Sequence, residues 1–194
     1  MLFILLALFP FPLAAETISR AGLTFSDELG GFRLLSVTGS GGIGDPFVVV
    51  EEYHGPGPAI LTVRGGAGAG GDPGAVLPSM SMLGLSMIKV VTNKGRVNWS
   101  SFDVELREVV SHSSPYGDGL SFDQAGIYGG VAEADRFSKH RGVYEPSDRL
   151  LFYAGHVPVD DTARLKLFIT DPSPTGLFYL VQQPGMAIAG LRRE

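Results

Sequence analysis

Short runs of β-branched and aromatic residues, separated by breaks rich in glycine and proline, make up most of the chain. Runs of this length and composition are typical of β-strands. No segment has the period of a long amphipathic helix, and only Val131–His140 suggests a short helical turn or an edge strand. The expected strands are Phe32–Thr38, Phe47–Tyr53, Ala59–Arg64, Gly84–Thr92, Trp99–Val110, Arg149–His156, Ala163–Thr170 and Leu177–Gln182.

Several of these runs alternate between apolar and polar positions. In Trp99–Val110, the apolar residues Phe102, Val104 and Leu106 alternate with charged ones, and Ala163–Thr170 behaves in the same way. A period of two residues with one apolar face indicates a half-buried antiparallel strand. The pattern therefore predicts an all-β fold, a single antiparallel β-sandwich or jelly-roll-like domain of about eight to ten strands.

The first fifteen residues have a different character from the rest of the chain. Thirteen of them are apolar, none is charged, and the segment ends in Ala14 and Ala15 before Glu16. An apolar segment that is too short to span a bilayer and ends in small residues is typical of a secretory signal. We therefore expect a signal peptide over residues 1–15, the β-sandwich over 16–185 and a tail over 186–194.

Composition adds an expected cellular location. The chain has no cysteine, 27 glycines, 13 prolines and a formal net charge of −5. An exported protein without disulfides is typical of the bacterial periplasm or exterior, and the acidic balance argues against nucleic-acid binding. The glycine-rich stretch Gly65–Gly74 is expected to be a surface loop.

One stretch resembles a known kind of protein. The turn Asn93-Lys94-Gly95 leads to Trp99 and Phe102, and a Gly-Asp-Gly-Leu segment over residues 117–120 follows. In this respect the chain resembles secreted bacterial β-sandwich proteins with exosortase-type C-terminal sorting signals, the PEP-CTERM-like proteins. The resemblance covers about thirty residues and implies a secreted sandwich without catalytic residues. The chain departs from that pattern at its end, because the apolar stretch Met186–Leu191 is too short to span a bilayer, so we expect no transmembrane span in the mature chain.

Two pairs of residues are candidates for ligand binding. Asp118 and Asp123 lie close together around a glycine-containing turn, so calcium is a possible cofactor there, because it is bound by several carboxylate and carbonyl oxygens. Trp99 offers a large apolar ring on which a sugar can stack, and Tyr116 is the second candidate for such a surface. The favoured alternative is that Trp99 is a core or rim anchor of the sandwich. No other cofactor is expected.

The sequence contains none of the common catalytic motifs. Gly-x-Ser-x-Gly, His-Glu-x-x-His and Ser-x-x-Lys are all absent, and we therefore assign no catalytic residue. Glu51 and Glu52 cannot line one cleft, because neighbouring strand residues face opposite sides, and we expect them to be the charged positions of an exposed strand. A hydrolase would require His112 or His156 beside a carboxylate and a nucleophile.

These observations favour a secreted, non-enzymatic β-sandwich with a binding role or a role in the envelope or extracellular matrix. Its partner is expected to be a glycan or an envelope protein. The first alternative is a carbohydrate-binding module, with or without calcium, and the second is a hydrolase with an unrecognised site.

Overall fold

The computed structural model describes residues 15–65, 84–114, 118–122, 132–143, 148–170 and 176–186. These residues form thirteen β-strands and no helix, so the all-β prediction is confirmed. In this part of the chain there is accordingly no helix long and apolar enough to cross a membrane. The expected signal peptide up to Ala14, the glycine-rich loop beyond Gly65 and the tail beyond Met186 lie outside the described residues.

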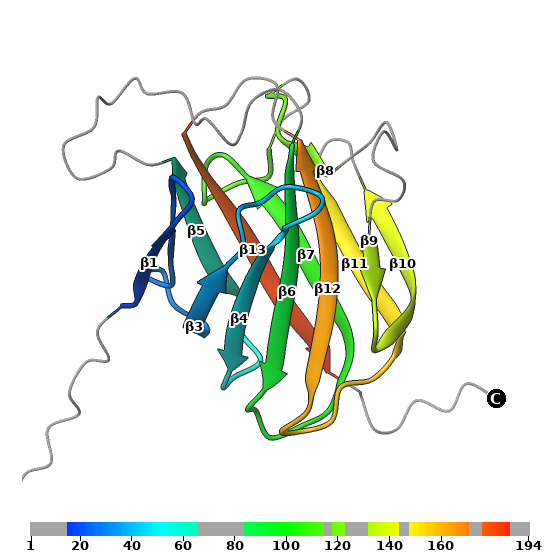
Figure 1. Ribbon diagram of the computed structural model, residues 1–194. Helices are drawn as coiled ribbons and strands as arrows, with labels where there is room; N and C mark the ends of the chain where they lie inside the picture. The colour runs from blue at the N-terminus through cyan, green and yellow to red at the C-terminus, as the bar shows by residue number, and fades with distance from the viewer. Residues whose placement is uncertain are drawn as a thin grey trace, which may run out of the picture.

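The strands form two sheets, which Figure 1 shows as two layers. The larger sheet has the strand order β1-β2-β5-β13-β7-β11-β10. Its strands are β1 (Thr17–Arg20), β2 (Leu23–Ser26), β5 (Ala59–Gly65), β7 (Trp99–Arg107), β10 (Phe137–Val143), β11 (Arg149–Gly155) and β13 (Leu177–Met186).

The smaller sheet has the order β3-β4-β6-β12-β8, and β9 also pairs with β12. Its strands are β3 (Arg33–Thr38), β4 (Phe47–Tyr53), β6 (Leu85–Asn93), β8 (Ser121–Phe122), β9 (Ala132–Ala134) and β12 (Thr162–Thr170). The expected strand count was too low because four of the strands have four residues or fewer, and two residues of alternation give no clear pattern. The former helix candidate Val131–His140 contains β9 and the start of β10.

The prediction that the sheets are purely antiparallel is wrong at one place. β4 and β6 are adjacent and parallel, from the pair Phe47 and Met87 to the pair Tyr53 and Asn93. This arrangement follows from the connections, because β4 and β6 each lead into a strand of the opposite sheet. Neighbouring strands that both cross to the other layer at the same end must run in the same direction.

We name these two crossings the first arch, Phe47–Gly65 (β4 and β5), and the second arch, Leu85–Arg107 (β6 and β7). Paired positions in β4 and β6 differ by a constant 40 residues. Residues 51–60 and 91–100 also share the same order of buried, half-buried and exposed positions. In the larger sheet, β5 and β7 lie on either side of β13. The two arches are therefore a structural repeat that the sequence conceals.

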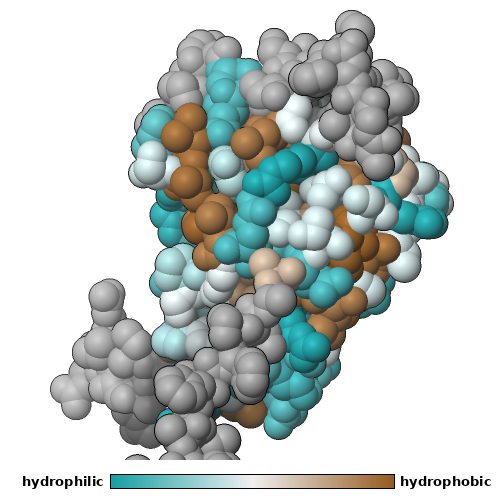
Figure 2. All heavy atoms as spheres, turned by 90° about the vertical axis from the view of Figure 1, so that its left-hand side faces the viewer, coloured by the Kyte–Doolittle hydropathy of each residue, from teal (hydrophilic) through white to brown (hydrophobic). Residues whose placement is uncertain are grey.

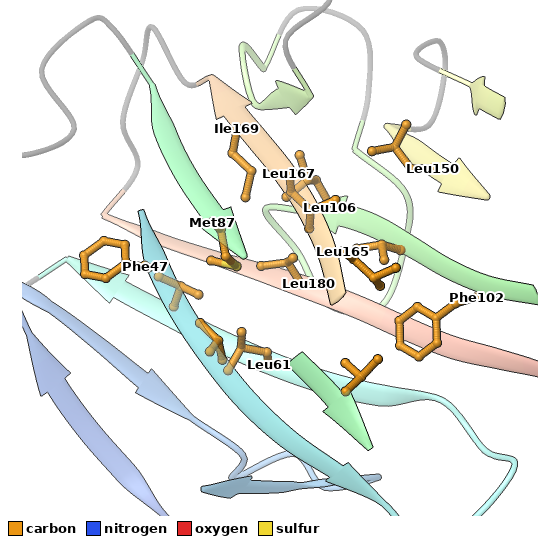
Figure 3. Packing of buried hydrophobic residues seen from close by; sticks show 14 of the residues in the cluster. Phe47, Leu61, Met87, Phe102, Leu106, Leu150, Leu165, Leu167, Ile169 and Leu180 are labelled. Atoms are coloured by element: carbon orange, nitrogen blue, oxygen red, sulfur yellow. The ribbon is translucent and has the colours of Figure 1, made fainter. Parts of the chain in front are cut away.

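The hydrophobic core lies between the two sheets. Figure 3 shows side chains from both layers meeting there, with Phe47, Met87 and Leu165 from the smaller sheet and Leu61 and Leu180 from the larger one. All five side chains are completely buried. The expected core positions Phe102 and Val104 of β7 are also buried, so the alternation in this strand was interpreted correctly.

The edge formed by β1, β2 and β3 carries mixed surface chemistry. Figure 2, which faces this side, shows apolar residues interrupted by polar ones. Leu29 and Leu35 are exposed, whereas the guanidinium of Arg20 donates a hydrogen bond to the carbonyl of Gly39, 3.0 Å away. This bond connects the β1 edge of the larger sheet to the segment after β3.

Candidate functional site

A pocket of about 410 Å³ lies where both arches turn from one sheet to the other. The turn after β4 and the turn after β6 form its walls, and the end of β13 closes it. We call this cavity the end pocket; its lining residues are His54, Gly55, Pro56, Gly95, Arg96, Val97, Trp99 and Met186.

The lining combines apolar surface with basic side chains. Pro56, Val97 and Met186 supply apolar surface, while the exposed Arg96 supplies a cation. His54 is also exposed, and its Nε2 lies 3.7 Å from a carboxylate oxygen of Glu52. Such a lining fits a ligand that offers both an apolar group and a negative charge.

A third loop extends the surface around the end pocket. Asn98 accepts a hydrogen bond from the backbone N–H of Val159 at 3.2 Å, and Lys94 forms an ion pair of 2.9 Å with Asp160. Val97 and Val159 are 49% and 38% exposed, on loops joined by these contacts. Large apolar side chains left open beside a pocket favour a role in binding.

Charged side chains lie between the sheets, inward from the end pocket. Glu51 of β4 and Lys89 of β6 are both completely buried and form an ion pair between Oε1 and Nζ. The hydroxyl of Tyr53, also completely buried, donates to Oε2 of Glu51 at 3.0 Å. The Tyr53 ring packs against Trp99 with a centroid distance of 5.6 Å, so this buried cluster borders the wall of the pocket.

Burial changes the acid–base properties of this cluster. The loss of water around Lys89 lowers its pKa, and the nearby charge and hydrogen bond of Glu51 offset only part of that effect. Burial also raises the pKa of Tyr53 well above its ordinary value, with a further contribution from the negative charge of Glu51. Tyr53 therefore keeps its proton and acts as a hydrogen-bond donor to the carboxylate.

The expectation that Glu51 belongs to an exposed strand is wrong. Glu52 is half-buried and faces outward, but Glu51 shares the inward face with Val49 and Tyr53. The signal was present in the sequence, because Glu51 occupies an apolar row of period two, as Lys89 does between Met87 and Val91. A charge in such a row is costly to bury alone, which should have prompted a search for its partner.

Of the two residues predicted to form a sugar-binding surface, the structure describes only Trp99. Trp99 is 1% exposed and its ring packs on Tyr53 and Phe102, which agrees with a core anchor and contradicts the alternative of a sugar-stacking platform there. Part of its side chain nevertheless lines the end pocket. Tyr116 lies outside the described residues.

The proposed calcium ligands are only partly described. Asp118 accepts a hydrogen bond from the backbone N–H of Leu120 at 3.1 Å, an arrangement typical of a turn. Its other carboxylate oxygen is buried without a hydrogen-bond partner among the described residues. Asp123 lies outside them, and the described residues contain no cluster of three or more groups that is suited to a metal ion. Calcium binding here stays a prediction.

The histidines named for the hydrolase alternative do not line the end pocket. Nδ1 of His112 lies 3.1 Å from the hydroxyl of Ser111, and this pair is exposed. His156 directly follows β11 and is also exposed. Neither histidine has an ion pair with a carboxylate within the described segments.

Comparisons with protein families, curated proteins and solved structures find no match for this chain. The case for a function therefore depends on the residues of the end pocket and of the buried cluster.

Proposed function

We propose that the chain is an exported, non-enzymatic β-sandwich protein that binds a protein partner of the bacterial envelope or extracellular matrix through the end pocket. The observation that carries the proposal is the combination of Arg96 with the exposed Val97 on a turn between two well-packed strands. Exposed groups held by rigid strands lose little conformational freedom on binding.

The chemistry of the pocket points to an acidic peptide segment with an adjacent apolar side chain. A carboxylate of the partner would pair with the guanidinium of Arg96, which offers several donors in a fixed plane. The apolar side chain would contact Pro56, Val97 and Met186. A protein partner is favoured over a glycan because the indole of Trp99 is covered by other rings.

Peptide display tests the proposed partner chemistry. A random peptide library is selected against the immobilised full chain, and enriched peptides should contain an acidic residue next to an apolar one. Replacing Arg96 by Glu should weaken their binding by about tenfold or more, because attraction becomes repulsion. The exposed Arg141 of β10, replaced by Glu, is the matched control and should leave binding unchanged.

The outcome that contradicts this proposal is equally clear. Peptides that bind both arginine variants equally well, or no enrichment at all, would overturn a role for the end pocket. Binding to a glycan panel, lost with EDTA, would instead support the carbohydrate-binding alternative and the calcium site at Asp118 and Asp123.

Export is tested separately from binding. The apolar segment Met1–Ala15 and the absence of cysteine support a signal peptide and a periplasmic or extracellular location. Expression of the full chain in a Gram-negative bacterium, followed by N-terminal sequencing of the periplasmic protein, should give a new terminus at Glu16. Uncleaved protein in the cytoplasm would contradict export.

A further inference from the structure

The ion pair between Glu51 and Lys89 is unusual because both side chains are completely buried between the sheets. Its paired neighbours across the parallel strands are apolar, since Val49 is paired to Lys89 and Val91 to Glu51. An ion pair without water must recover a large desolvation penalty through its own contact. This makes the neutral forms of the two groups more accessible than they are in solution.

Transfer of one proton from Lys89 to Glu51 converts the pair into an amine beside a carboxylic acid. Burial lowers the pKa of Lys89, which favours this transfer. An amine and a carboxylic acid held in contact are the reactants for an amide bond. Their fixed proximity replaces a bimolecular encounter, which greatly raises the effective concentration of the nucleophile.

We infer that Glu51 and Lys89 condense into an amide bond that covalently joins β4 to β6. After the proton transfer to Oε1, the lone pair of the Lys89 nitrogen attacks Cδ of Glu51, and the electrons of the carbonyl bond move to Oε2. The nitrogen then gives a second proton to Oε1, the bond from Cδ to Oε1 breaks, and one water leaves. The ammonium and the carboxylate have then become one amide and one water, without any oxidant, reductant or cofactor.

Tyr53 is the catalytic residue of this reaction, because its hydroxyl touches Oε2 at 3.0 Å. Its hydrogen bond stabilises the negative charge that develops on Oε2 while Cδ is tetrahedral. The raised pKa of Tyr53 keeps that proton in place. In the product, the same hydroxyl donates to the amide oxygen, so no buried acceptor is left without a partner.

The surroundings favour the product over the reactants. Condensation replaces two buried charges by one neutral amide, which removes the cost of burying them. The water that is formed is lost to bulk solvent, and the dry core keeps the concentration of water beside the bond low, which disfavours hydrolysis.

Gln182 offers a competing acyl group on the opposite sheet. Its side chain is completely buried, and neither amide atom has a hydrogen-bond partner among the described residues. Tyr53 packs on Phe102, which pairs with Pro184. On the inward face of β13, Gln182 lies two residues before Pro184. On the inward face of β4, Glu51 lies two residues before Tyr53, so Gln182 lies at the level of Glu51. The direct contact of Lys89 with Glu51 favours Glu51 as the partner.

Peptide mapping of the purified full chain tests the bond. The denatured protein is treated with an amine-acetylating reagent, digested and examined by tandem mass spectrometry. The expected product is a branched peptide that contains Glu51 and Lys89, lighter by one water, about 18 Da, than its two parts. Lys89 should resist acetylation, whereas Lys166, whose exposed ion pair with Glu133 measures 3.6 Å, should be acetylated and unlinked.

Two variants, with Lys166→Met as the control, separate catalysis from folding. Lys89→Met should abolish the branched peptide, and Lys166→Met should leave it unchanged. Tyr53→Phe removes a single oxygen, and pulse labelling should show the bond forming about 100-fold more slowly in this variant. This second variant remains informative if Lys89→Met fails to fold.

The contrary results are distinct. Separate peptides with a fully acetylated Lys89 in the wild-type protein would overturn the bond and leave an ion pair. A branched peptide that contains Gln182 and has lost ammonia, about 17 Da, would overturn the assignment to Glu51. Neither result depends on whether the end pocket binds a partner.

Discussion

The two arches follow the same path but contain different interiors. Glu51 of the first arch is paired in register with Val91 of the second, and Lys89 of the second with Val49 of the first. Each arch therefore contributes one charge, at a position where the other arch has a valine. A repeated backbone path can therefore bury an ion pair when each copy supplies one of the two opposite charges.

The turns of the two arches are also supported differently. In the first arch, the backbone N–H of Ile60 donates to Gly30 at 3.1 Å. Gly31 has a φ of +90° and no space for a side chain beside the carbonyl of Pro58. In the second arch, Trp99 exchanges two backbone hydrogen bonds of 3.0 Å with Val157. Each crossing thus depends on a segment from a different part of the chain.

Making the two arches alike should have the largest effect on stability. Lys89→Val copies the first arch into the second, removes the inferred amide and leaves Glu51 buried without a cation, which should cost about 3–5 kcal/mol. Glu51→Val leaves Lys89 unpaired and should cost a similar amount. The double variant buries two valines and should be at least about 1 kcal/mol more stable than either single variant. Urea unfolding of all four proteins measures these differences.

The exposed pair of Lys166 and Glu133 is the control for this cycle. Valine at both positions should change stability by less than about 1 kcal/mol, with no resolvable coupling, because exposed ion pairs contribute little. Additive losses at Glu51 and Lys89 would show that the two buried charges do not depend on each other.

The two arches also differ at their turns, where we expect replacement of Asn93 to have a smaller effect on stability. It occupies the position of Tyr53 in the second arch, and its side-chain amide donates to the carbonyls of Val97 and Val157 at 2.9 and 3.1 Å. Asn93→Ala should cost about 1–3 kcal/mol, because buried polar groups lose their partners. The exposed Asn98, replaced by Ala, should cost less in the same thermal or urea unfolding experiment. Equal losses would show that burial of Asn93 is unimportant for the turn.

The strands of the two arches show which parts of the fold could be predicted from the sequence. Runs such as Phe47–Tyr53 are rich in β-branched and aromatic residues, and this strand has the predicted boundaries. The parallel pairing of β4 and β6 was hidden because it depends on where β5 and β7 go, which no local pattern records. The sequence shows Lys89 within an apolar row. It does not show that its partner is Glu51, because Glu51 belongs to another strand.

The end pocket was predictable only in part. The turns at Gly55 and Gly95 are marked by glycine, and Trp99 was recognised as the start of a strand. That His54 and Arg96 line one pocket could not be predicted without knowing the 40-residue register between the arches. Trp99 was expected to be a core or rim anchor, with a sugar surface as the alternative, but nothing in its neighbours predicted that Tyr53 would cover its ring.

The smallest expected effects concern carboxylates at the outer faces of β7 and β5, the second strand of each arch. They should appear as a pH dependence of stability. On β7, burial opposes ionisation of Glu105, but hydrogen bonds from Arg107 and Ser113 and the positive charges nearby outweigh it, so its pKa is lowered. A lowered folded-state pKa stabilises the fold above the pKa of the unfolded chain, and this contribution disappears as the pH falls through the folded-state value. Glu105 is only partly shielded from solvent, so Glu105→Gln should cost at most about 0.5 kcal/mol near neutral pH.

The corresponding carboxylate beside β5 is Glu28. Its hydrogen bond and charge interaction with Arg64 lower its pKa, although its carboxylate is mostly in contact with water. Urea midpoints of wild type and each glutamine variant should approach each other as the pH is lowered from about 6, because protonation removes the charge of each carboxylate. The convergence should be larger for Glu105, since it is more buried and accepts bonds from two side chains. A larger effect at Glu28 would show that proximity to Arg64 matters more than burial on these faces.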